Sequence, residues 1–409
     1  MDGFDTLIVG GGHGGAQAAI ALRQLGFAGN VAIVTEEDEP PYERPPLSKE
    51  YLGGEKTFER MLIRPPGFWI ERNVELRLGQ RVVAVDPAAH AIELGDGSRV
   101  AYGNLIWAAG GVPHRLKCDG ADLRGVHSIR SKRDVDALRV ELGAAERVAI
   151  VGGGYIGLEA AAVLVKLGKS VTLIEAAERV LSRVAGPPLS RFFEAEHRAH
   201  GVDVRTEAEV DRIEGDATMA TGLRLASGER IAADRVIVAI GIAAAARPLL
   251  DAGAAGADGV DVDEYCRTSL PNVFAVGDCA AHENHFAGGR RLRLESVQNA
   301  NDQATTAAKA IVGRPEPYAA LPWFWSNQYD LRLQTAGLWH GFDGLVVRGE
   351  PASRCFTVLY LRSGRLIAAD CVNSVRDYAQ ARKIIAEGRK VDTSRLGDVN
   401  SALKDMIMG

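Results

Sequence analysis

The sequence contains few cysteines and no cluster of them. The five in its 409 residues are far apart and form neither a C-x-x-C pair nor a Cys/His spacing typical of metal ligands: Cys118, Cys266, Cys279, Cys355 and Cys371. This distribution disfavours a disulfide framework, a zinc site and a bound iron–sulfur cluster. We therefore expect no metal site, and we expect most of the thiols to be buried as small apolar side chains.

Long hydrophobic runs and an excess of positive charge are also absent. No apolar run approaches the roughly eighteen residues that cross a membrane as a helix, and the first expected strand is under way by Thr6, so we expect no signal peptide. The net charge of −5 gives no support to nucleic-acid binding. We therefore expect a cytoplasmic globular protein, and its length predicts two or three domains.

Glycine, in contrast, is abundant, with 46 residues. The apolar run 7–9 predicts a short buried strand, and it is followed by the glycines of a G-x-G-x-x-G turn: Gly10, Gly12 and Gly15. In such a turn the first glycine makes the bend, the second admits a pyrophosphate, and the third lets a helix pack against the strand. The small residues at 16–22 predict that helix, whose N-terminus would face the pyrophosphate.

Two acidic residues follow the second expected strand, 31–34. A carboxylate about twenty residues after the glycine turn binds ribose hydroxyls in dinucleotide-binding proteins, so Glu36 and Glu37 are candidates. The next loop has four prolines, which bar a helix through it, and it carries Arg44 and Lys49 on the side where the fold binds its ligand. The alternative for this loop is a solvated surface segment.

The same pattern occurs a second time. The expected strand 148–151 is followed by the glycines of a second turn: Gly152, Gly154 and Gly157. The next strand, 171–174, is followed by Glu175. This internal duplication predicts sites for two different dinucleotides. Because a carboxylate accepts from a ribose 2′-OH and repels a 2′-phosphate, Glu175 favours NADH over NADPH, while the nearby Arg179 leaves NADPH open.

The rest of the chain contains a further strand-end turn and a separate C-terminal region. An apolar run leads directly into Gly277 and Asp278, and the segment 303–311 lies in an expected helix. After a loop at 315–322, several short strands and a helix at about 374–387 predict an antiparallel sheet with one or two covering helices.

These residues resemble the FAD-dependent NADH–ferredoxin reductases of the putidaredoxin reductase type, within the pyridine nucleotide-disulfide oxidoreductase-like superfamily. Besides the two turns, the resemblance includes the segments 44–49 (RPPLSK), 154–159 (GYIGLE), 268–278, 295–299 (ESVQN) and 323–326 (WFWS). It implies an α/β fold with two Rossmann-like domains, for FAD and NAD, plus a C-terminal α+β domain. The implied boundaries are 1–112 and 243–320 for the FAD domain, 113–242 for the NADH domain and 321–409 for the C-terminal domain.

The resemblance also implies site residues. The first turn and Glu36 hold the ADP half of FAD, and the second turn holds NADH together with Glu159 and Glu175. The implied catalytic residues are Lys49, Glu159 and Trp325. The implied cofactor-binding residues are Gly10, Gly12, His13, Gly14, Gly15, Glu36, Arg44, Lys49, Val82, Ala109, Gly110, Gly152, Gly154, Tyr155, Ile156, Gly157, Glu159, Glu175, Ala239, Gly241, Gly277, Asp278, Glu295, Val297 and Trp325.

The implied function is transfer of electrons from NADH through FAD to a [2Fe–2S] ferredoxin that feeds an oxygenase, either a haem-thiolate monooxygenase or a Rieske dioxygenase. A basic group could attract an acidic ferredoxin or form a solvated face: Arg290, Arg291 and Arg293. We expect a monomer. An NADH oxidase that produces peroxide, and an NADH-binding redox-reporting protein, remain alternatives. A disulfide reductase is disfavoured because no cysteine precedes Cys118.

Overall fold

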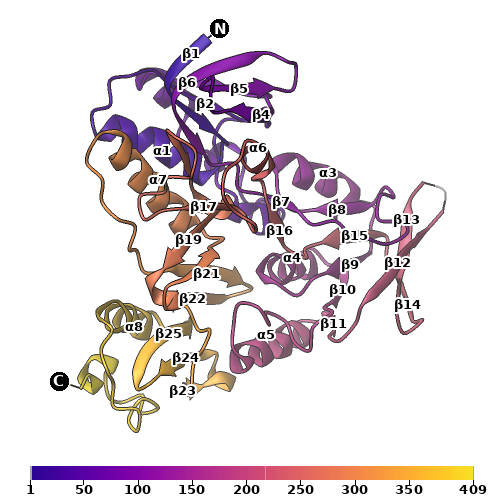
Figure 1. Cartoon of the computed structure of the whole chain (residues 1–409). Coiled ribbons are helices and arrows are strands. Elements are labelled where there is room, and N and C mark those ends of the chain that lie inside the picture. Colours follow the sequence, from indigo (N-terminus) through magenta and orange to yellow (C-terminus); the bar gives the residue numbers. More distant parts are fainter. Residues whose placement is uncertain (1, 217, 409) are drawn as a thin grey trace. The chain divides into compact units, whose positions relative to one another are not determined.

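The computed structural model describes residues 2–216 and 218–408, and the chain in it divides into two compact units. Each unit is assembled from three separate segments. Unit 1 comprises Met1–Arg44, Phe58–Val112 and Ala243–Pro322, and unit 2 comprises Pro45–Thr57, Pro113–Ile242 and Trp323–Gly409. Two short strands contain points where the chain passes from one unit to the other: β7 (Gly111–Pro113) and β16 (Ile242–Ala244). Figure 1 shows the course of the chain by colour.

Unit 1 is built on a seven-stranded sheet whose centre is parallel. Its strand order is β3 (Val74–Arg77), β2 (Val31–Val34), β1 (Asp2–Val9), β6 (Arg99–Trp107), β5 (Ala91–Leu94) and β4 (Val82–Asp86), and β18 (Val273–Ala275) pairs with β6. Strands β1, β2, β3, β6 and β18 pair in parallel, whereas β4, β5 and β6 pair antiparallel. The remaining elements are α1 (His13–Gln24), α2 (Pro66–Glu71), α6 (Arg247–Asp251), α7 (Val297–Ile311), η2 (Glu59–Met61), η3 (Gly277–Cys279), η4 (His285–Ala287) and the small sheet of β17 (Val260–Val262), β19 (Ala280–Asn284) and β20 (Arg290–Arg293).

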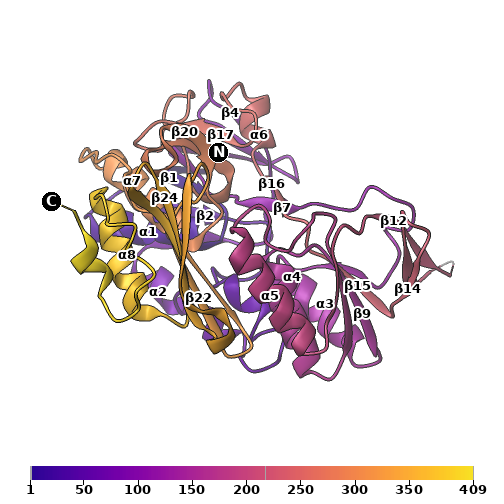
Figure 2. The same cartoon turned by 90° about the horizontal axis from the view of Figure 1, so that it is seen from below.

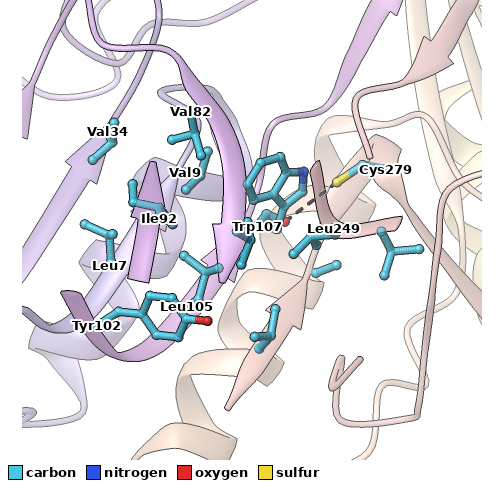
Figure 3. Packing of buried hydrophobic residues seen from close by; sticks show 14 of the residues in the cluster. Leu7, Val9, Val34, Val82, Ile92, Tyr102, Leu105, Trp107, Leu249 and Cys279 are labelled. Carbon is cyan, nitrogen blue, oxygen red and sulfur yellow. Dashed lines mark hydrogen bonds between the residues drawn. The ribbon is translucent and has the colours of Figure 1, made fainter. Parts of the chain in front are cut away.

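The sheet of unit 1 has a hydrophobic core on each face, because successive side chains of a strand point to opposite sides. On β1, Leu7 and Val9 belong to one cluster and Ile8 to the other, where it packs with the alanines of α1. Figure 3 shows the first cluster, which includes Trp107 and Cys279. The buried indole of Trp107, on β6, donates to the carbonyl of Ala245 at 2.7 Å. This bond ties the segment Ala243–Pro322 to the seven-stranded sheet.

Unit 2 contains a five-stranded parallel sheet and a five-stranded antiparallel one. The parallel order is β11 (Asp203–Arg205), β10 (Ser170–Ile174), β9 (Arg147–Val151), β15 (Arg235–Val238) and β8 (Val126–Ser128), with helices α3 (Lys132–Leu142), α4 (Tyr155–Lys166) and α5 (Pro187–Ala199). A small sheet of β12 (Val210–Gly215), β13 (Ala220–Leu225) and β14 (Arg230–Ala232) lies beyond β9 on the side away from α4 (Figures 1 and 2).

The antiparallel sheet of unit 2 has the order β21 (Trp323–Gln328), β22 (Leu331–Gly337), β25 (Arg365–Val372), β24 (Cys355–Arg362) and β23 (Gly344–Glu350). Helix α8 (Val375–Glu387) packs on β22 and β25, and Figure 1 shows it beside β25. The short helices η1 (Pro45–Ser48), η5 (Pro351–Ser353) and η6 (Leu403–Met406) complete the unit.

The α/β fold class predicted from the sequence is confirmed, with several differences in detail. The helix expected to contain 303–311 runs from Val297 to Ile311, and Ser296 caps it by accepting from the amide of Asn299 at 3.1 Å. The proline-rich loop contains one short helix, η1, since proline suits a first helical turn. Within the described ranges, no helix is long and apolar enough to cross a membrane. The three-domain division stays a prediction.

Candidate dinucleotide sites

The glycine turn of unit 1 joins β1 to α1. Gly10 has a φ of +114°, and a side chain on it would clash with the carbonyl oxygen of Ala108. A side chain on Gly15 would clash with the carbonyl of Gly10. Gly12 is the N-cap of α1, and a side chain on it would meet no protein atom within 4 Å, so the space beside the N-terminus of α1 is open. This arrangement fits a pyrophosphate.

The glycine turn of unit 2 joins β9 to α4 in the same way. Gly152 has a φ of +112°, and a side chain there would clash with the carbonyl of Ala239. A side chain on Gly157 would clash with Gly152, and Gly154, the N-cap of α4, has open space beside it. Each unit therefore contains its own cradle, a strand–turn–helix with three predicted glycines at the turn and a shape that fits a dinucleotide; binding there stays a prediction.

The first turn of each helix also carries predicted residues. In unit 1, Gly14 is buried and His13 is the first residue of α1. In unit 2, Ile156 is 41% exposed, while Tyr155 packs against Phe324 of β21 with ring centroids 4.6 Å apart. Ile156 is thus available to a ligand. The part of Tyr155 in binding stays a prediction.

The residue after the second strand differs between the cradles. The Gly10 amide donates to Val34 and the Gly152 amide donates to Ile174, both at 2.8 Å, so Thr35 and Glu175 occupy equivalent positions. The Glu175 carboxylate accepts from the amides of Gly153 at 2.7 Å and Ala177 at 2.8 Å. Its oxygens retain lone pairs for ribose hydroxyls. The equivalent position in unit 1 has no carboxylate.

Glu36 and Glu37 lie one and two residues beyond Thr35 and have different surroundings. The Glu36 side chain is 64% exposed and lies 3.8 Å from Arg81. Glu37 is held by the Tyr42 hydroxyl at 2.5 Å and by Arg44. The structure thus fixes Glu37 more firmly than Glu36, whose predicted contact with FAD is untested.

Arg44 forms an ion pair with Glu37 and also feels the charge of Asp278. Burial opposes the Arg44 charge, but nearby Tyr42, Glu37 and Asp278 outweigh it and raise the pKa of Arg44. Arg44 therefore stays a cation close to Asp278. The supporting residues Glu37 and Tyr42 were not singled out by sequence reasoning for this role.

The turn that carries Asp278 is hydrogen-bonded to helix α7. Gly277, with a φ of +76°, donates to the buried amide oxygen of Gln303 at 2.8 Å. Arg293 donates to the backbone carbonyl of Asp278 at 2.6 Å and to the Glu295 carboxylate at 3.1 Å. Val297 is the first residue of α7. The predicted group Gly277, Asp278, Glu295 and Val297 is therefore brought together, while Gln303 was missed.

Three other predicted residues of unit 1 lie at or near the sheet. Ala109 and Gly110 follow β6, next to the Ala108 carbonyl that closes on the glycine turn. Val82 is a core residue of β4 with 8% exposure. The first two border the cradle, whereas any cofactor contact of Val82 stays a prediction.

Glu159 lies on α4 in unit 2 and is 4% exposed. One of its oxygens accepts from Lys49 at 2.8 Å and from the Ser48 hydroxyl at 2.5 Å. The other accepts from the Ser326 hydroxyl at 2.6 Å. Lys49 and Glu159, both predicted as catalytic, are thus directly paired. Trp325 precedes Ser326 on β21, and its side chain points to the opposite face of that strand, away from Glu159. The catalytic role of Trp325 stays a prediction.

The remaining predicted NADH residues lie at the end of β15. Ala239 donates to Val151 at 2.7 Å, and Gly241 has a φ of +96°. Arg179, which left NADPH open, donates to the Ala185 carbonyl and the Ser190 hydroxyl, both at 2.7 Å. The Arg179 guanidinium is therefore already engaged by protein atoms.

The thiols offer no redox pair. All five cysteines are free. Burial raises the pKa of Cys279 to about 11 and also raises the pKa of Cys266 and Cys371. These buried thiols therefore stay protonated near neutral pH and are poor nucleophiles.

Comparison with known proteins supports this reading of the chain. Residues 4–304 match the pyridine nucleotide-disulphide oxidoreductase family and residues 323–407 match the reductase C-terminal family. The chain is 61% identical to the ferredoxin reductase subunit of 5,5′-dehydrodivanillate O-demethylase from Sphingobium sp. (strain NBRC 103272 / SYK-6), with 99% of both chains covered. It is 56% identical to a ferredoxin–NAD(P)+ reductase of Sphingomonas sp., covering 93% of this chain and 92% of the relative.

A solved structure agrees with these sequence relationships. The putidaredoxin reductase–putidaredoxin covalent complex contains a chain that matches with a TM-score of 0.94 and 36% identity, covering 99% of this chain and 98% of that one. The protein therefore belongs to the ferredoxin reductases of the putidaredoxin reductase type, within the pyridine nucleotide-disulphide oxidoreductase family.

Proposed function

We propose that this protein passes electrons from NADH through bound FAD to a [2Fe–2S] ferredoxin, which supplies an oxygenase. The observation that carries the proposal is the presence of two separate dinucleotide cradles in a chain 61% identical, over almost its whole length, to the ferredoxin reductase subunit of an O-demethylase. Members of this family use FAD and NAD(P)H.

In unit 1, the proposed FAD site has residues suited to each charged part of the cofactor. The N-terminus of α1, capped by Gly12, would hold the pyrophosphate, and the N-terminus of α7 at Val297 would add a second positive helix end. Arg44 and Asp278 supply a cation and a carboxylate near one another. Bound at these residues, FAD would supply the chemistry that links a two-electron hydride donor to a one-electron acceptor.

In unit 2, Glu175 supports NADH as the donor. Its carboxylate, fixed by two backbone amides, would accept hydrogen bonds from ribose hydroxyls and would repel a 2′-phosphate. Arg179 is engaged with Ala185 and Ser190 and so offers its charge less readily to a phosphate. Glu159, on the helix that starts at this cradle, and its partner Lys49, which follows η1, would act at the nicotinamide end.

The basic group of β20 gives weaker support for ferredoxin docking. Arg291 lies 3.6 Å from Asp261 and 3.5 Å from Glu283. Arg293 lies 2.9 Å from Asp258 and also pairs with Glu295. Since nearby carboxylates balance much of this charge, the docking surface is left unassigned.

The test is NADH-driven reduction of a [2Fe–2S] ferredoxin coupled to cytochrome c, with peroxide followed in parallel and NADPH as a control. We expect turnover that depends on ferredoxin, little peroxide, and faster turnover with NADH than with NADPH. Equal NADH consumption without ferredoxin, with peroxide accumulating, would identify an oxidase. Slow oxidation under every condition would favour a redox-reporting protein. The expected cytoplasmic location is part of the proposal and is tested by cell fractionation.

A further inference from the structure

A buried chain of hydrogen bonds ends on Glu159 within unit 2. The Ser326 hydroxyl, which donates to Glu159 at 2.6 Å, lies 3.2 Å from the side-chain amide nitrogen of Gln328. The Gln328 carbonyl oxygen lies 2.9 Å from Nε2 of His197, and Nδ1 of His197 lies 2.9 Å from the Tyr329 hydroxyl. Five side chains from three elements and one turn are thus linked in series.

Strand β21 and helix α4 hold the Glu159 end of this hydrogen-bond chain, because their side chains recur on one face at regular intervals. Residues 324, 326 and 328 alternate along β21 and therefore share one face. Residues 155 and 159 are one turn apart on α4 and share one side of that helix. Phe324 packs against Tyr155, and Ser326 bonds to Glu159. The strand therefore docks on the NAD(P)H-binding helix through an aromatic contact followed by a hydrogen bond.

The linking groups are deeply buried. His197 is 0% exposed, Ser326 1%, Gln328 2% and Glu159 4%. Buried polar groups are costly unless each finds a partner, and every one of these groups has one. A network satisfied in this way fixes the positions of its members.

The chemistry of the groups fixes the direction of every bond. The Gln328 oxygen is an acceptor, so Nε2 of His197 must carry the hydrogen and Nδ1 must accept from Tyr329. The Gln328 amide then donates to Ser326, and Ser326 donates to Glu159. All four bonds therefore point toward the carboxylate. Burial lowers the pKa of His197 to about 4, which agrees with a neutral ring at working pH.

We propose that His197, Gln328 and Ser326 form a one-way hydrogen-bond chain that positions the Glu159 carboxylate for its work on NAD(P)H. The amide of Gln328 donates from nitrogen and accepts at oxygen, so the chain orients groups and does not conduct a proton. By holding one Glu159 oxygen, the chain leaves the other to Ser48 and Lys49. The inference rests on the proposed function in one respect, that Glu159 acts in the NAD(P)H site.

The first test measures the protonation of His197 in the hydrogen-bond chain and does not depend on catalysis. In the oxidised holoenzyme labelled with ¹⁵N-histidine, NMR should show His197, assigned by its loss in His197→Gln, as the neutral Nε2–H tautomer from pH 6 to pH 8. An Nδ1–H tautomer or a charged ring in this range would overturn the proposal.

The second test separates positioning from stability. Ser326→Ala should slow flavin reduction at saturating NADH roughly tenfold, the effect of one hydrogen bond to a charged group, while NAD+ affinity measured by calorimetry changes less than about threefold. Ser326→Thr restores the hydroxyl and should recover most of the rate. The matched control is Asn327→Ala, because Asn327 is an exposed neighbour on the other face of β21.

A histidine pair of variants tests the direction of the chain. His197→Gln can place a donor near the Nε2 position, whereas His197→Asn retains polar atoms only near Nδ1, so the glutamine variant should keep more of the flavin-reduction rate. Equal loss in both variants, or a Ser326→Ala protein that loses thermal stability but reduces flavin at the wild-type rate, would overturn the proposal. If wild-type protein fails to reduce ferredoxin while flavin reduction still depends on Ser326, the proposed function fails and the positioning chain stands.

Discussion

The two glycine turns have nearly the same backbone and differ in the side chain that follows the second strand. Gly10 and Gly152 have φ values of +114° and +112°, and each is closed against a carbonyl of a neighbouring strand end. After that strand, unit 1 has Thr35 where unit 2 has Glu175. The two turns thus share a backbone suited to a pyrophosphate, and they differ in whether the strand-end residue brings a carboxylate to that site.

The largest expected effect comes from filling the third glycine of each turn. Gly15→Ala and Gly157→Ala each place a methyl group against a backbone carbonyl, which we expect to cost about 3 kcal/mol or more of local stability. Gly15→Ala should yield protein with little bound flavin by absorbance. Gly157→Ala should retain flavin that dithionite reduces and NADH does not.

The matched controls are Gly12→Ala and Gly154→Ala, where a methyl group meets no protein atom within 4 Å. Both variants should unfold at close to the wild-type temperature and lose affinity for their dinucleotide. If they unfold like the Gly15 and Gly157 variants, steric closure of the turns does not explain the difference.

Unit 2 also contains a buried carboxylate away from its glycine turn, that of Asp370 on β25. Burial raises the pKa of Asp370 to about 7, although the Tyr360 hydroxyl donates to it at 2.6 Å. An unfolded aspartate has a pKa of about 3.9, so the folded protein loses stability as pH rises from about 4 through 7. Asp370→Asn should raise the free energy of unfolding at pH 8 by on the order of 2 kcal/mol and change it little at pH 4. Chemical denaturation at both pH values measures this, and an equal effect at both would contradict it.

Truncating Glu175 should weaken dinucleotide use much more than truncating Thr35, the equivalent residue of unit 1. Glu175→Ala should lower kcat/KM for NADH by roughly 30-fold, the loss of hydrogen bonds to a charged group, with a smaller change for NADPH. The corresponding Thr35→Ala should change FAD affinity by less than about threefold. Steady-state kinetics and flavin release measure the pair. A parallel fall for NADH and NADPH would show that Glu175 does not discriminate between them.

The smallest expected effect concerns Arg179. Because its guanidinium donates to Ala185 and Ser190, Arg179→Ala should leave the ratio of kcat/KM for NADH and NADPH within about threefold of wild type. A selective loss of NADPH activity would instead assign Arg179 to the 2′-phosphate.

Local sequence patterns predicted much of this fold. The strand at 31–34 has the expected bounds, and those expected at 148–151 and 171–174 begin one residue earlier, because short apolar runs between turn residues determine them. Helices α3 and α5 were not predicted. Helix α3 depends on a capping box between Ser131 and Asp134, and α5 begins with two prolines.

The site was predictable where it is local in sequence and unpredictable where it is assembled by the fold. The glycine turns and Glu175 lie within short motifs. The positioning chain joins His197 to Gln328 and Ser326 to Glu159, residues separated by 131 and 167 positions. The motif that contains Ser326 was noted for its tryptophans, and only tertiary packing reveals its bond to Glu159.

The most direct test of the account is an anaerobic titration of the holoenzyme and a [2Fe–2S] ferredoxin with NADH. Electron balance predicts that each NADH reduces two equivalents of ferredoxin, and that NADPH reduces it more slowly. Ferredoxin that stays oxidised after NADH has reduced the flavin would contradict this electron-transfer role. So would one peroxide formed per NADH in air whether or not ferredoxin is present.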